Sequence, residues 1–149
     1  MKILTDFTKD KAMHSLGVAN FMRVWAHKLN LDENKAWLIG YIHDIGYMIE
    51  SNNHSYHGKE LMAPYSQELS YFIGKHDTSE PIKDNMEFLL RVADLTIDHE
   101  GRYVGMEVRR NSICMRDGNK VHAILDEQIR NIKDYAEKHG FTEIIEVCK

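Results

Sequence analysis

Cysteine is scarce in this chain, and long apolar runs are absent. Its two cysteines, Cys114 and Cys148, form no CxxC spacing and no zinc-type pattern, so we expect reduced thiols and a cytoplasmic protein. No run of about 18 apolar residues occurs, so the sequence predicts no membrane span. Residues 1–6 lack the long apolar segment and the small-residue cleavage site of a signal peptide.

A large excess of charge of either sign is also absent. The net charge of −4 argues against electrostatic binding, so we expect neither a nucleic acid polymer nor a membrane as partner. Only two prolines occur, and there is no linker, internal repeat or low-complexity segment. With 43% hydrophobic and 28% charged residues, the composition is that of a soluble globular protein. We therefore predict a single domain over residues 1–149, which buries roughly 68–70% of its unfolded surface.

The hydrophobic periodicity is helical almost throughout the chain. In the first predicted helix, residues 9–30, apolar residues recur every three to four positions, and His14 lies on that apolar stripe. Acidic residues at 32–33 suit a helix start, and Gly46 is the expected end of that second helix. Further helices are predicted over residues 54–62, 66–76, 84–97 and 120–139. The predicted fold class is all-α, a bundle of about six to seven helices.

Two segments are harder to assign. The periodicity weakens over residues 98–118, where residues 103–115 fit a minor hairpin, a loop or a short helix equally well. Residues 141–149 are too few to classify. The seventh helix of the predicted bundle depends on the first of these segments.

Six histidines and aspartates are spaced so that each falls on the inner side of a predicted helix or at its end. Taken singly, each has an ordinary explanation, since an inward histidine is usually a hydrogen-bonded core residue and Asp94 can pair with Arg91. Taken together, four imidazoles and two carboxylates suit borderline divalent metals such as Fe, Mn, Ni, Co or Zn. Buried carboxylates also need cations. The set consists of His14, His43, Asp44, His54, His76 and Asp94.

The number of these side chains indicates two metal ions. Six ligands are too many for one tetrahedral zinc site with an open position. They suit two divalent ions about 3.5–4 Å apart that share a carboxylate bridge and a water or hydroxide. We therefore predict two divalent transition metals as cofactors.

In this order, the set resembles the HD superfamily of metal-dependent phosphohydrolases, and residues 43–46 spell its HDIG signature. The resemblance covers about residues 9–98. Residues 14–18 and 92–94 look similar to the small bacterial hydrolases that cleave diadenosine tetraphosphate symmetrically. The resemblance implies an HD-type helical bundle. It also implies one metal held by His14, His43, Asp44 and Asp94, with Asp44 bridging to a second metal held by His54 and His76.

The family pattern favours one of two neighbouring histidines and is not followed at Tyr47. Family members usually have a ligand histidine four residues before a small residue, which favours His54, before Gly58, over His57. We expect His57, one turn further on, to line the mouth of the site or to act on substrate. Tyr47 stands where family members often have a lysine, which removes one candidate phosphate contact.

The resemblance implies a phosphohydrolase that acts on a nucleotide or related small phosphorylated molecule through a metal-activated hydroxide. Asp44, His57 and Arg102 are the predicted catalytic residues, and Lys59, Lys75 and Arg109 are further candidate cations for the phosphate. Two alternatives stay open: a di-iron oxygenase on the same ligands and a non-catalytic metal or nucleotide sensor. A homodimer is also left open.

Overall fold

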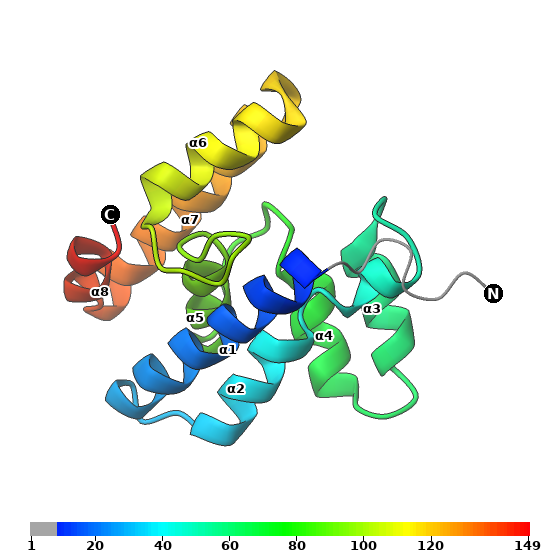
Figure 1. The fold of residues 1–149 in the computed structure, drawn as a ribbon. Helices are drawn as coiled ribbons and strands as arrows, with labels where there is room; N and C mark the ends of the chain where they lie inside the picture. Colours follow the sequence, from blue (N-terminus) through cyan, green and yellow to red (C-terminus); the bar gives the residue numbers. More distant parts are fainter. Residues whose placement is uncertain (1–8) are drawn as a thin grey trace.

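The protein has a helical fold (Figure 1). The computed structural model describes residues 9–149. Its α-helices (α) and 3-10 helices (η) are α1 (Lys9–Lys28), α2 (Glu33–Ile42), η1 (Ile45–Met48), α3 (His54–Met62), α4 (Gln67–Lys75), α5 (Asn85–Asp94), α6 (Met106–Asp117), η2 (Asn119–Val121), α7 (His122–His139) and α8 (Thr142–Val147). The all-α prediction is confirmed.

Three of these helices begin where a short polar side chain caps them. The side chain of Asp32 accepts a hydrogen bond from the Lys35 amide at the start of α2, and Asp84 accepts one from the Glu87 amide at the start of α5. The hydroxyl of Ser66 does the same for α4. Each bond satisfies one of the amides that a helix start leaves unpaired. The sequence pattern predicted all three starts to within about two residues.

The suggested minor hairpin over residues 103–115 is wrong, because most of this segment is helix α6. Gly105, at φ 88°, precedes the helix and Gly118, at φ 82°, ends it; both adopt backbone conformations that favour glycine. Within residues 9–149, the nearest approach to a strand is an isolated bridge between Ile97 and Tyr103. With α6 and the C-terminal α8, the described residues contain eight α-helices, more than the six to seven predicted.

Helix α5 lies between two hydrophobic clusters and contributes to both. Leu89, Leu90 and Ala93 face the cluster formed with α1, α2 and α4. Phe88 and Val92 face the cluster formed with α6, α7 and α8. We call residues 9–75 the N-terminal half and residues 106–147 the C-terminal half. In Figure 1, α6 and α7 project together from the rest of the fold.

An ion pair on α5 is buried within the fold. Arg91 donates to Glu87 at 2.8 Å, and both side chains are 1% exposed. Arg91 also donates to the carbonyl of Thr78, which ties the loop after α4 to α5. Removing one partner of such a pair leaves a buried charge and costs about 3–5 kcal/mol. Arg91 therefore pairs with Glu87 and Thr78, whereas Asp94 pairs with His14.

No helix among residues 9–149 combines the length and the apolar character needed to cross a membrane.

Candidate metal centre

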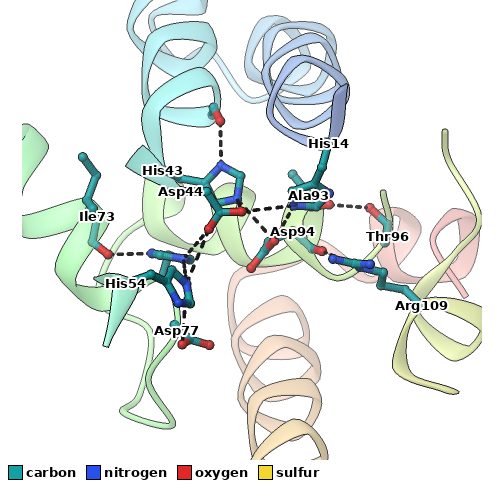
Figure 2. A network of polar contacts seen from close by, with 12 residues as sticks. His14, His43, Asp44, His54, Ile73, Asp77, Ala93, Asp94, Thr96 and Arg109 are labelled. Atoms are coloured by element: carbon teal, nitrogen blue, oxygen red, sulfur yellow. Dashed lines mark hydrogen bonds and ion pairs between the residues drawn. The ribbon is translucent and has the colours of Figure 1, made fainter. Parts of the chain in front are cut away.

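The structure brings the six predicted histidines and aspartates together at one place in the fold (Figure 2). His14 comes from α1 and Asp94 from the end of α5. His43 and His76 are the residues that follow the last turns of α2 and α4, and His54 opens α3. Their donor atoms form two groups, within each of which the atoms lie within 4.8 Å of one another. The first group is His14, His43, Asp44 and Asp94, and the second is Asp44, His54 and His76.

Three of the four imidazoles are fixed in one tautomer by the backbone. The Nδ1–H of His43 donates to the carbonyl of Gly40 at 2.6 Å, and that of His76 donates to Ile73 at 2.6 Å. His14 donates from Nδ1 to the carbonyl of Asp98 at 3.1 Å. In the neutral ring, a protonated Nδ1 leaves Nε2 with a lone pair. This backbone support is the arrangement that orients histidine ligands around metals.

The carboxylate of Asp44 lies between the two groups of donor atoms. Its Oδ2 is 3.3 Å from His43 Nε2, whereas its Oδ1 is 3.3 Å from His76 Nε2 and 3.5 Å from His54 Nε2. On the side of the first group, Asp94 Oδ1 lies 2.9 Å from His14 Nε2 and 3.3 Å from His43 Nε2. Each oxygen of Asp44 therefore faces a different group, which is the placement that a bridging carboxylate needs.

Burial and neighbouring charges shift the pKa values of the candidate ligands in opposite directions. Burial raises the pKa of Asp44, but the adjacent His43 outweighs it and holds that pKa well below its usual range. The pKa of Asp94 is likewise held well below its usual range, by its hydrogen bond to His14 and by the nearby His43. Burial lowers the pKa of His43, yet Asp44 holds it well above the usual value. The carboxylates thus stay charged and favour a positive charge among the imidazole Nε2 atoms.

The donor set fits divalent transition metals. His43 Nε2 is buried, has no hydrogen-bond partner among the described residues, and lies 3.3 Å from both Asp44 Oδ2 and Asp94 Oδ1, so a metal cation here could take the place of a proton on this nitrogen. His54 Nε2 and His76 Nε2 lie only 3.2 Å apart. Burial and the neighbouring His76 lower the pKa of His54 to about 4, so His54 is neutral at pH 7. Convergent imidazoles beside ionised carboxylates are the ligands that Fe, Mn, Ni, Co and Zn accept.

The glycine of the HDIG signature has a steric role. A Cβ at Gly46 would lie 1.6 Å from the carbonyl oxygen of His54, so η1 can approach the start of α3 only without a side chain. A Cβ at Gly58 would lie 2.6 Å from Ile73 Cγ2, so this position also permits close packing. Both glycines therefore set the position of His54 beside Asp44.

A cavity of about 230 Å³ opens on the two groups. Asp44, His54 and Asp94 line it on one side. The opposite wall belongs to the C-terminal half and includes Ile113, Val121, Ile124, Leu125 and Gln128. Its positive side chains are Lys11, Arg109 and Arg116. The site thus combines buried anions and imidazoles with cations that can contact a phosphoryl oxygen.

Two predicted catalytic residues lie elsewhere. The imidazole of His57 is 3.6 Å from Glu50 and does not line the cavity. Arg102 is 66% exposed in its side chain and pairs with Asp98 and Glu100, at 3.2 and 3.0 Å. The structure therefore does not bring Arg102 to the metal ligands. Of the other predicted cations, Arg109 alone lines the cavity, while Lys75 pairs with Glu80 and Lys59 packs beside Gly74.

Four charged residues that were not predicted as site residues line the same cavity, namely Lys11, Asp77, Arg116 and Asp117. The ammonium of Lys11 lies 3.8 Å from the ring centroid of Tyr47, and that ring stacks on His54 at 4.3 Å. A cation from α1 therefore covers the tyrosine that stands where the family often has a lysine. The sequence did contain a signal for Lys11: it lies one helical turn before the candidate ligand His14, so both side chains share one face of the helix.

Comparison with known proteins agrees with this geometry. Residues 12–129 match the HD domain family, so the chain belongs to the HD-domain family. Ribonuclease Y of Desulfotalea psychrophila and Ribonuclease Y of Oleidesulfovibrio alaskensis are each 29% identical to it over 99 residues, 63% of this chain. Ribonuclease Y of Nitratidesulfovibrio vulgaris is 26% identical to the chain over 99 residues. The chain spans 19% of the length of these curated relatives. No solved structure matches it. The suggested likeness to diadenosine tetraphosphate hydrolases gains no support, because the relatives found are named Ribonuclease Y.

Proposed function

We propose that this protein is a metal-dependent phosphohydrolase with a binuclear centre. The observation that carries the proposal is the carboxylate of Asp44, whose two oxygens face separate groups of imidazoles at 3.3–3.5 Å. The first metal would be held by His14, His43, Asp44 and Asp94. The second would be held by Asp44, His54 and His76. When bound, two such ions supply Lewis acidity and a hydroxide at neutral pH, because they lower the pKa of water from about 15.7 towards about 7.

The remaining work falls to the chain's own side chains. Hydrogen bonds to the carbonyl groups of Gly40 and Ile73 keep Nδ1 of His43 and His76 protonated, so each ring would bind a metal through Nε2. Arg109 and Lys11 line the cavity, where their positive charges can bind a phosphorylated substrate. The apolar side chains of the opposite wall limit the access of water to the reacting phosphorus.

The proposed substrate is a nucleotide or a related small phosphorylated molecule. A cavity of about 230 Å³ suits a phosphoryl group and part of its leaving group. A second candidate is the phosphodiester bond at the end of an RNA chain, which the Ribonuclease Y relatives favour. A single-stranded end is the part of an RNA chain most able to enter a cavity of this size.

Elemental analysis combined with a hydrolysis panel tests the proposal. The protein is purified, its metal content is measured, and it is assayed after loading with Mn²⁺, Ni²⁺, Co²⁺, Zn²⁺ or Fe²⁺. The panel contains nucleoside monophosphates, aryl phosphates, diadenosine tetraphosphate and short RNA. We expect two metal ions per chain and metal-dependent hydrolysis of at least one class. Hydrolysis of RNA alone would favour the second candidate.

The two alternatives from the sequence predict different results. A di-iron oxygenase would contain iron, show a mixed-valent electron paramagnetic resonance signal and consume O₂, with no release of phosphate. A sensor would bind metal or nucleotide and leave the whole panel intact. Either result would replace the phosphohydrolase proposal.

A further inference from the structure

A second cavity adjoins the candidate metal centre. It measures about 360 Å³ and is lined by Asp10, Lys11, His14, His99, Arg109, Ser112 and Arg116. Three cationic residues, Lys11, Arg109 and Arg116, line both this cavity and the one that opens on Asp44 and Asp94. These three side chains therefore stand at the boundary between the two cavities.

Arg109 is the buried member of this group. The residue is 7% exposed, and its only hydrogen bond among residues 9–149 runs from Nε to the carbonyl of Asp94 at 3.5 Å (Figure 2). Within that part of the chain no carboxylate lies within ion-pair distance of it. Its neighbour Arg110, by contrast, pairs with Asp126 at 2.7 Å. A buried cation without an anionic partner is costly, so the guanidinium of Arg109 is available to an anion.

Lys11 adds a second positive charge to the same boundary. The ring of Tyr47 holds its ammonium at 3.8 Å from the ring centroid. Burial lowers the pKa of Lys11; Asp44 and Asp94 oppose this shift, while Arg116 and Arg109 add to it. Arg116 is half exposed and pairs with Asp117 at 2.9 Å, so it completes the rim. An anion bound here would offset the repulsion among these cations.

We propose that Arg109 and Lys11 form a second phosphate subsite, which binds a second phosphoryl group of the substrate whose first phosphoryl group lies at the metal centre. This inference rests on the proposed function and narrows it. The substrate class is one that carries at least two phosphoryl groups, such as a nucleoside diphosphate or a 5′-phosphorylated oligonucleotide. A planar guanidinium suits this task because two of its N–H groups can bind two phosphate oxygens at once.

Equilibrium dialysis of the metal-loaded protein, at buffered free metal concentration, tests the subsite without turnover. The probes are inorganic phosphate, methylenediphosphonate, and a dinucleotide with a 5′-phosphorothioate and a phosphorothioate linkage. We expect at least one of the two-group probes to bind about tenfold or more tightly than inorganic phosphate. Arg109→Gln is expected to lower the affinity for that probe by about tenfold to a hundredfold, because a charge-assisted hydrogen bond is lost. Binding of inorganic phosphate should change by less than about threefold.

Arg110→Gln is the matched control, because it makes the same change one residue further along α6, at a side chain outside both cavities. It is expected to bind all three probes as the wild type does, and circular dichroism checks that both variants are folded. Tighter binding of methylenediphosphonate identifies a phosphoanhydride substrate, and tighter binding of the dinucleotide identifies an oligonucleotide end. Equal binding of one-group and two-group probes, or wild-type binding by folded Arg109→Gln, would overturn the subsite. Metal content and hydrolysis are measured separately, so a failure of the proposed function is recognised independently.

Discussion

The two halves of this protein contribute different chemistry to one cavity. In the N-terminal half and α5, short contacts to backbone carbonyls fix the imidazoles, as in the bond from His43 to Gly40 at 2.6 Å. The C-terminal half contributes none of the six candidate ligands among residues 9–149. It supplies an apolar wall and the cations of α6, and it is attached to α5 by contacts such as Phe88 with Tyr135, whose ring centroids lie 5.2 Å apart.

The metal ligands and the cations of the site therefore depend on different parts of the fold, and we expect them to serve different steps, hydrolysis and substrate binding. The candidate metal ligands are placed by the ends and faces of α1 to α5, so they depend little on how α6 and α7 pack. The cations Arg109 and Arg116 depend entirely on that packing, because α6 follows α5 after a loop and lies against α7. We therefore expect changes at the six candidate ligands to abolish turnover, and changes at the boundary cations to alter substrate binding.

The largest effect is expected from Asp44→Ala, which removes the carboxylate that faces both donor groups. Both metal ions should be lost and hydrolysis should fall to the uncatalysed background, because Asp44 is the one residue among 9–149 that belongs to both donor groups. Metal content by mass spectrometry and the hydrolysis rate are the measurements. Full activity in a folded Asp44→Ala protein would contradict the whole assignment.

Gly46→Ala is expected to affect mainly the second donor group. The added Cβ would meet the His54 carbonyl oxygen at 1.6 Å, so η1 and α3 must separate and carry His54 away from Asp44. We expect metal content to fall from about two ions to about one, a loss of about 1–3 kcal/mol in the free energy of unfolding, and a loss of about a hundredfold in rate.

Gly74→Ala controls for the change from glycine to alanine. Its Cβ would meet only the flexible side chain of Lys59, at 3.0 Å, and should leave the metal content unchanged. Two tightly held ions in Gly46→Ala would show that the close approach of η1 to α3 does not position the second group.

Lys11→Met addresses recognition rather than reaction. Methionine keeps an unbranched side chain against the Tyr47 ring but removes the charge that lines both cavities. We expect about a tenfold rise in KM with kcat changed by less than about threefold, since a contact made equally in the ground and transition states affects binding alone. A fall in kcat with an unchanged KM would instead place Lys11 in the chemical step.

The smallest effect is expected from His57→Ala. His57 lies in the same helix as His54 but contacts Glu50 at 3.6 Å and is absent from the cavity lining. Metal content and kcat/KM should stay within about twofold of the wild type, as is usual for a partly exposed charge pair. His54→Ala, assayed in parallel, should lose the second metal ion. A loss of activity in His57→Ala would restore the catalytic role that the sequence suggested.

The sequence was most informative where helix ends and candidate ligands coincide. Asp32, Ser66 and Asp84 cap the helices that lead to His43, His76 and Asp94, so periodicity and capping together place these side chains at the correct ends of α2, α4 and α5. The family spacing favoured His54 over His57, and the structure places His54, and not His57, in a donor group.

The cations were less accessible to sequence reasoning. Arg102, Arg109 and Arg110 lie close together in the chain, and only the packing of α6 separates a buried arginine from two surface ion pairs. Gly105 and Gly118 bracket that helix, but their positive φ values suit a hairpin turn as well as helix ends. Long-range packing of this kind has no signature in local spacing.

The backbone carbonyls that hold His43 and His76 belong to Gly40 and Ile73, each three residues earlier and each in the final turn of its helix. Such carbonyls have no partner within the helix, so the imidazole occupies an acceptor that would otherwise bind water. The length of each helix therefore determines the direction in which its histidine ligand points. One residue inserted into α2 or α4 would rotate the following ligand by about 100°, whereas the same insertion in the loop after Met62 would leave every ligand in register with its own carbonyl.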